Sequence, residues 1–131
     1  MNVAFFPLLI SALSIFLLGG LWYSNCLFGA VWVREAKIDP KPEGQGHGAT
    51  PFLASFLFSL ISAAIFGWLV GPHPAIGQAL TLGLLIGVGF VATSFGINYQ
   101  FGGRSFKLWL IDAGYHILQY LIYGAVFGLL A

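Results

Sequence analysis

Four long apolar stretches, separated by short polar connections, make up most of the chain. A helix of about 20 apolar residues crosses the roughly 30 Å hydrocarbon core of a bilayer. The pattern therefore predicts an all-α, four-helix transmembrane bundle with short loops, in a single domain covering residues 1–131. The predicted membrane helices are residues 3–24, 51–70, 75–98 and 107–130.

The connections carry signals for turns and helix ends. We expect the first helix to end near the aromatic pair Trp22-Tyr23 and an interfacial turn to follow it. Residues 34–50 contain prolines, glycines and mixed charges, which predicts a solvent-exposed loop. Thr50 and Ser105 are the expected N-caps of the helices that follow.

Composition supports a membrane protein. Hydrophobic residues make up 59% of the chain and charged residues 7%, whereas soluble domains average about 25% charged residues. The formal charge of +1 includes no basic tract suited to nucleic acid. The single cysteine and the three histidines have no metal-ligand spacing, so neither a metal nor a cofactor is indicated.

The distribution of basic residues predicts an orientation. All five lie in the first and third connections: Arg34, Lys37, Lys41, Arg104 and Lys107. Because positively charged loops stay in the cytoplasm, both termini are predicted to lie outside.

Small residues recur at spacings that allow helices to approach closely in lipid. One row on the second predicted helix has four-residue spacing, and further glycines lie on the third and fourth helices. The packing positions predicted from this pattern are Ser55, Ser59, Ala63, Gly67, Gly83, Gly87, Gly114 and Gly128. The row on the second helix, or the glycine face of the last helix, is the expected interface of a homo-oligomer.

The last predicted helix carries an unusual polar stripe. At 100° per residue, Asp112, His116, Gln119 and Tyr123 fall within an arc of about 60°. Polar side chains facing lipid are costly, so this stripe is expected to face protein or water. With the predicted topology, Tyr23 and Asn98 reach the same cytoplasmic half of the membrane.

Two interpretations of this polar group stay open. In the first, Asp112, His116, Gln119, Asn98 and Tyr23 line a cytoplasm-facing cavity for a small solute, an ion or a lipid headgroup. In the second, the same residues only bond helices to one another and fix their packing. Because no nucleophile stands beside the aspartate and histidine in sequence, the chain is more typical of a non-enzymatic protein.

Two motifs carry a resemblance to a known family. GGLWYS with the following LFGAVW, and GRSFKLWLIDAGYH at residues 103–116, resemble the bacterial membrane family catalogued as domain of unknown function 1761. The resemblance implies a multi-pass protein of the bacterial inner membrane and brings no established activity with it. Tyr23, Gly114, Tyr115 and His116 match the family pattern, whereas Asn25 and Asp112 stand where the family often has proline and asparagine.

These patterns favour a small transport or permeation protein with its polar site on the last helix. The alternative is a membrane scaffold or accessory subunit whose polar residues specify helix packing. The expected partners are the lipid bilayer and further copies of the chain.

Overall fold

The computed structural model describes residues 3–38 and 48–131, and every regular element in these residues is a helix. In chain order the elements are α1 (Phe5–Trp22), α2 (Gly29–Ala36), α3 (Ala49–Val70), α4 (Ile76–Ile86), the π-helix η1 (Gly87–Ala92), α5 (Thr93–Phe101) and α6 (Phe106–Leu130).

Four helical segments are long and apolar enough to cross a membrane, which confirms the predicted fold class. They are Phe5–Trp22, Ala49–Val70, Ile76–Phe101 and Phe106–Leu130. The third combines α4, η1 and α5 and ends three residues later than the predicted limit at residue 98. The first is shorter at both ends than the predicted 3–24.

The connection after α1 differs from the prediction. A turn follows Trp22 as expected, but α2 then forms an additional short helix that reaches into the predicted loop at residues 34–50. Left-handed Lys37 (φ 56°) ends α2. Residues 39–47, the rest of that loop, lie outside the described residues.

The two predicted N-caps have different outcomes. The side chain of Ser105 accepts a hydrogen bond from the Leu108 amide at 3.1 Å, so it caps α6 as predicted. The Thr50 prediction was wrong, because α3 begins at Ala49, two residues before the predicted start at residue 51, and Gly48 occupies its N-cap position.

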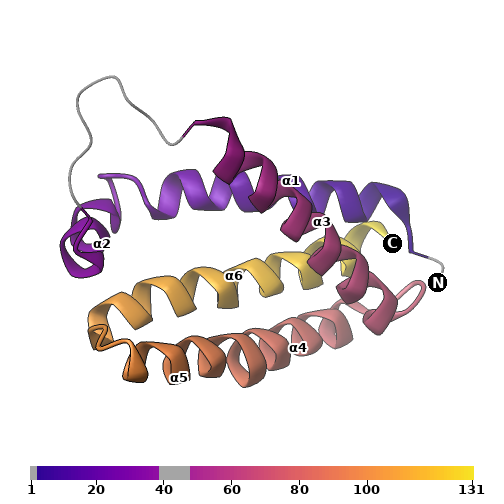
Figure 1. Ribbon diagram of the computed structural model, residues 1–131. Helices are drawn as coiled ribbons and strands as arrows, with labels where there is room; N and C mark the ends of the chain where they lie inside the picture. The colour runs from indigo at the N-terminus through magenta and orange to yellow at the C-terminus, as the bar shows by residue number, and fades with distance from the viewer. Residues whose placement is uncertain (1–2, 39–47) are drawn as a thin grey trace.

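Helix α6 is the centre of the bundle and contacts every other helical element of the described chain. Figure 1 shows α4, η1 and α5 running alongside α6, with α1 on its other side. Helix α3 crosses obliquely and packs mainly on α1, making much smaller contacts with α4 and α6.

The described basic residues gather at one end of the bundle. Helix α2 and the turn between α5 and α6 lie together there (Figure 1), and they carry Arg34, Lys37, Arg104 and Lys107. We call this the basic end. The start of α1, the turn from α3 to α4 and the end of α6 lie at the opposite end.

Glycines allow the backbones of α4 and α6 to meet. A Cβ atom at Gly83 would lie 2.2 Å from the carbonyl oxygen of Tyr120, and one at Gly124 would lie 2.5 Å from that of Ala79. Gly87 and Gly128 are similarly close to the backbone of the facing helix. This backbone approach needs residues without side chains, as small-residue packing in membranes predicts.

The predicted row on α3 is only partly buried. Ala63 and Gly67 face the interior, where a Cβ atom at Gly67 would lie 2.6 Å from the Phe127 ring. Ser59 is 5% exposed, whereas Ser55 at the start of the row is exposed. These contacts, and the contact of Gly114 with the Trp22 ring, join parts of the same chain to one another.

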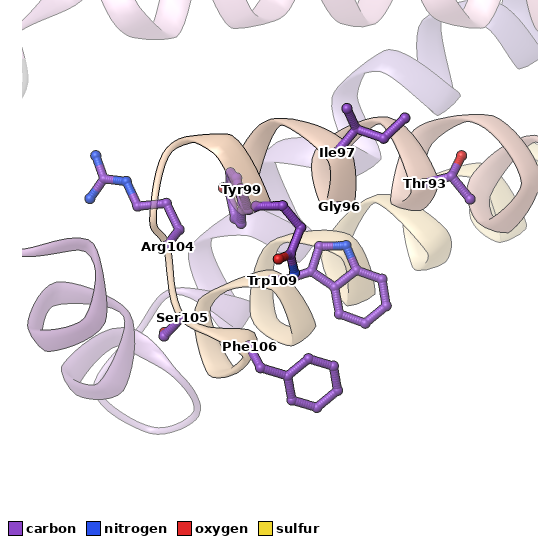
Figure 2. Close-up of a pocket in the computed structure, with 9 residues that line it drawn as sticks. Thr93, Gly96, Ile97, Tyr99, Arg104, Ser105, Phe106 and Trp109 are labelled. Carbon is purple, nitrogen blue, oxygen red and sulfur yellow. The ribbon is translucent and has the colours of Figure 1, made fainter.

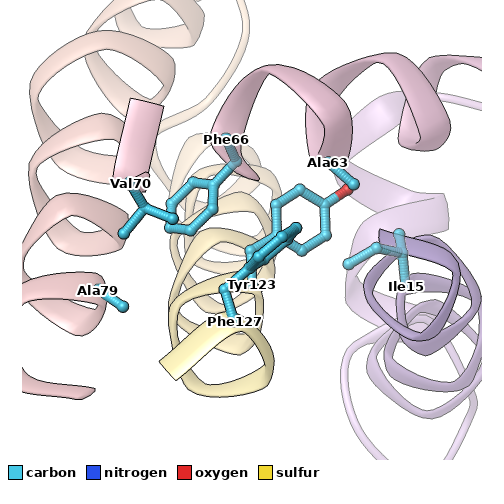
Figure 3. Close-up of a cluster of buried hydrophobic side chains, with 7 residues drawn as sticks. All are labelled: Ile15, Ala63, Phe66, Val70, Ala79, Tyr123 and Phe127. Carbon is cyan, nitrogen blue, oxygen red and sulfur yellow. The ribbon is translucent and has the colours of Figure 1, made fainter. Parts of the chain in front are cut away.

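The apolar core lies toward the opposite end and is built around aromatic rings from α3 and α6. Phe66 packs against Tyr123 and Phe127 with both ring centroids 5.8 Å away (Figure 3). Each of these three side chains is at most 1% exposed. The interior of the bundle is therefore closely packed around these three rings.

Candidate functional site

The polar residues of α6 form two separate groups rather than one. The first surrounds Asp112, which is 8% exposed. Its Oδ1 accepts a hydrogen bond of 2.7 Å from the Tyr23 hydroxyl, and its Oδ2 accepts one from the Tyr99 hydroxyl. A buried carboxylate is tolerated when donors satisfy both oxygens, so the two tyrosines stabilise Asp112 and tie the end of α1 and α5 to α6.

Two tryptophans reinforce this group. The Trp22 indole donates to the Ile111 carbonyl at 2.9 Å, and the Trp109 indole donates to the Ala92 carbonyl at 2.8 Å. Tryptophan in the membrane interface usually has its polar edge toward water. Here both N–H groups instead point at backbone of another helix and fix the helix ends.

The second group is a chain of hydrogen bonds deeper in the bundle. His116 Nδ1 lies 2.6 Å from the Gln119 amide oxygen, and the Gln119 amide nitrogen donates to the Tyr123 hydroxyl at 3.1 Å. Tyr123 continues the chain to Ser62 on α3, at 2.9 Å between hydroxyl oxygens. The polar stripe of α6 therefore joins α3 to α6.

The chain assigns a role to each nitrogen of the imidazole. Since the Gln119 oxygen can only accept, Nδ1 of His116 carries the proton that it donates. In the neutral ring, Nε2 is then left as a hydrogen-bond acceptor. The ring is held between Phe95, stacked at 5.0 Å, and the edge of Tyr115, also at 5.0 Å between centroids.

Two adjoining cavities lie beside the deeper group. The larger, about 620 Å³, lies between α1, α2 and the start of α3 at the basic end. The smaller, about 330 Å³, is lined by His116, Gln119 and the serines of α3. Both are lined by Ile15, Ser55 and Tyr115, so they meet at these residues.

Both cavities are open to the protein surface, and exposed Ser55 and Phe58 are part of the lining of the smaller one. Gly20, Val33 and Ser55 in their lining are exposed, so the larger cavity opens to the protein surface near the basic end. Beyond Tyr123 lies the aromatic core of Figure 3. The polar chain thus lies between these two cavities and the aromatic core.

The structure separates the residues that the sequence grouped together. His116 and Gln119 line the smaller cavity, and Tyr23 and Tyr115 line the larger one. Asp112 lines neither of these two cavities, and its oxygens accept hydrogen bonds from Tyr23 and Tyr99. Asn98 is exposed on α5 and lies outside both cavities.

Several residues of the site were missed in the sequence. Tyr99, and not the predicted Asn98 beside it, donates to Asp112, and Ser62 and Phe95 contact the deeper group. Helical spacing offered one signal, since Phe95 and Tyr99 are four residues apart and so share a face. Ser62 lies off the predicted small-residue row and gave no such signal.

The described residues contain no cluster of three or more histidine, cysteine, aspartate or glutamate side chains that could hold a metal ion. Four apolar spans with a buried polar interior define a multi-pass membrane protein. Residues 6–128 match the model of the family described as "Protein of unknown function (DUF1761)", and the chain belongs to that family. Comparison with curated proteins and with solved structures found no match.

Proposed function

We propose that the protein is a membrane transport protein for a small, uncharged polar solute. The observation that carries this proposal is the pair of adjoining cavities, which share three lining residues, with the larger open near the basic end and the aromatic core packed beyond the polar chain. A site accessible from one side only is the arrangement that alternating access requires.

The lining suggests the solute class. The smaller cavity is lined by His116, Gln119, Ser59 and Ser62 among apolar groups. Among the described residues, no carboxylate, lysine or arginine lines it. Such a site favours a solute that forms several hydrogen bonds without a full charge.

Orientation and location belong to the same proposal. The basic end faces the cytoplasm, because basic residues are retained there during insertion. We infer the bacterial inner membrane as the location from the family resemblance given above. A homo-oligomer also stays a prediction; a monomer by detergent-corrected light scattering, both in mild detergent and in nanodiscs, would contradict it.

A second candidate function is that of a scaffold or accessory subunit. The polar groups are largely paired with one another, as in Tyr23–Asp112 and His116–Gln119, which is what a purely packing role requires. In that case the cavities would bind nothing.

Solute flux into proteoliposomes distinguishes the two candidates. Stopped-flow light scattering after an osmotic step would use glycerol, erythritol and xylitol as probes. Transport predicts protein-dependent entry of at least one of them, greatly reduced in His116→Ala and Gln119→Leu.

The matched control is His73→Asn. His73 is exposed in the turn after α3, and asparagine tolerates its left-handed backbone (φ 49°). This variant should transport normally. A scaffold predicts no protein-dependent flux of any of the three probes, together with lower thermal stability in His116→Ala.

A further inference from the structure

A third cavity, of about 390 Å³, lies on the other side of the bundle at the turn between α5 and α6. Figure 2 shows Arg104 and Ser105 at the turn and Thr93 at the far end of the cavity, with the Trp109 ring beside Gly96. This cavity shares none of its lining residues with the two cavities of the proposed transport site.

The lining changes character along the cavity. At the turn it is polar and positively charged, with Arg104, Gln100 and Ser105. The rest of the lining is mainly apolar, with Phe106 beside the turn and Ile97 and Trp109 farther along, and Thr93 lies at the far end. Ile97 is 62% exposed and Phe106 69% exposed, so this part of the lining faces outward rather than toward the protein interior.

Hydrogen bonds hold two of these side chains in place. Arg104 Nη1 donates to the Ala36 carbonyl of α2 at 3.0 Å, which occupies one of the five N–H donors of a guanidinium. Trp109 is fixed by its bond to Ala92 and stacks on Phe106 at 5.5 Å between ring centroids. Gly96 has no side chain to crowd the indole of Trp109, whereas a Cβ atom at this position would lie only 3.3 Å from Nε1.

We propose that this cavity binds an anionic phospholipid, with its headgroup phosphate on Arg104 and an acyl chain along Ile97, Phe106 and Trp109. The guanidinium matches a phosphate in charge and geometry, and it lies where two membrane helices end, at the depth of lipid headgroups. A soluble anion would make no use of the apolar part of the cavity, whereas a lipid fills both parts.

The site also adjoins the Asp112 group. Tyr99 lines this cavity and donates its hydroxyl to Asp112. A bound lipid therefore contacts a residue that holds α5 against α6, and it is expected to stabilise that end of the bundle.

Native mass spectrometry of the full-length protein with added phosphatidylglycerol or phosphatidylcholine tests the proposal. We expect tighter binding of phosphatidylglycerol, and about tenfold weaker binding of it by Arg104→Gln, the factor for loss of a charge-assisted contact. Arg104→Lys, which keeps the charge, should retain part of the preference. Inorganic phosphate in large excess should not displace the lipid.

The matched control is Lys107→Gln. Lys107 carries the same charge as Arg104 and lies about one turn away, but it does not line the cavity. The affinity of this variant for phosphatidylglycerol should stay within about twofold of the unmodified protein, because only general attraction changes. Equal weakening in Arg104→Gln and Lys107→Gln would overturn the proposal, as would displacement by inorganic phosphate.

Fluorescence of the unmodified protein gives a second test that does not depend on the folding of an Arg104 variant. Brominated phosphatidylglycerol should quench tryptophan emission more than brominated phosphatidylcholine does, and Trp109→Phe should remove that excess. Equal quenching by the two lipids would overturn the proposed site.

Discussion

The Tyr23 hydroxyl donates a hydrogen bond to Asp112 Oδ1 at 2.7 Å, joining residues 89 positions apart in the chain. This bond connects the end of α1 to the first turns of α6. Tyr99 of α5 donates to the other oxygen of the same carboxylate. The one acidic side chain buried in a predicted membrane helix is therefore a junction of three helices.

Loss of this junction should destabilise the bundle. Tyr23→Phe removes one donor to a buried carboxylate, and we expect a loss of about 1.5–3 kcal/mol in the free energy of unfolding. Titration with sodium dodecyl sulfate in mixed micelles measures it. In a double-mutant cycle with Asp112→Ala, which removes the acceptor oxygens, the two losses should not add, because each change abolishes the same bond. Additive losses would contradict the junction.

Because α4 packs closely on α6, replacing Gly83 with alanine should destabilise the protein far more than replacing Gly77 with alanine. Gly83→Ala places a methyl group against the Tyr120 carbonyl, so the helices must separate, at a cost of about 1–3 kcal/mol. Gly77 lies in the same helix with open space around it, and Gly77→Ala should be neutral or slightly stabilising. Equal effects of the two changes in the same titration would contradict this packing.

The polar chain that ends at Tyr123 should contribute to stability as well as to binding. Tyr123→Phe leaves Gln119 and Ser62 without the hydroxyl that they share in the interior, and we expect a loss of about 1–3 kcal/mol. Thr81→Ala is the control, because its hydroxyl is exposed and bonds only its own helix. A Tyr123→Phe variant as stable as the control would show that the chain is not formed.

Topology can be tested independently of function. Since the described basic residues lie at one end of the bundle, a reporter fused after Ala131 should be found outside the cytoplasm. A reporter found in the cytoplasm would reverse the orientation, and with it the side from which we expect the solute to enter.

Much of the fold could be predicted because it depends on local sequence. Apolar length defines the four spans, and a single serine before an apolar run correctly predicted the start of α6. Helix α2 was missed because its eight residues follow a turn and are too short to give a clear period. The π-helix η1 could not be predicted, because it does not change the length of the apolar stretch in which it lies.

The site was harder to predict because it depends on the rotation and crossing of helices. Helical spacing correctly placed Asp112, His116, Gln119 and Tyr123 toward the interior, yet it could not show that Asp112 turns to α1 and α5 while His116 turns to a cavity beside α3. Likewise, Tyr99 and Asn98 are neighbours in sequence, and only the packing of α5 on α6 selects the tyrosine.

The central claim is that the His116 cavity is reached by water from the basic end alone, and cysteine accessibility tests it most directly. In a Cys26→Ser background, Ser55→Cys and Ser59→Cys place thiols in the cavity, and Leu57→Cys places one on the exposed apolar face of α3. A membrane-impermeant, charged methanethiosulfonate is applied to either side of oriented vesicles. We predict that it modifies the thiols at residues 55 and 59 from the cytoplasmic side only, and the thiol at residue 57 from neither side. Modification at residue 59 from the outer side, or no modification of either cavity thiol, would contradict the account.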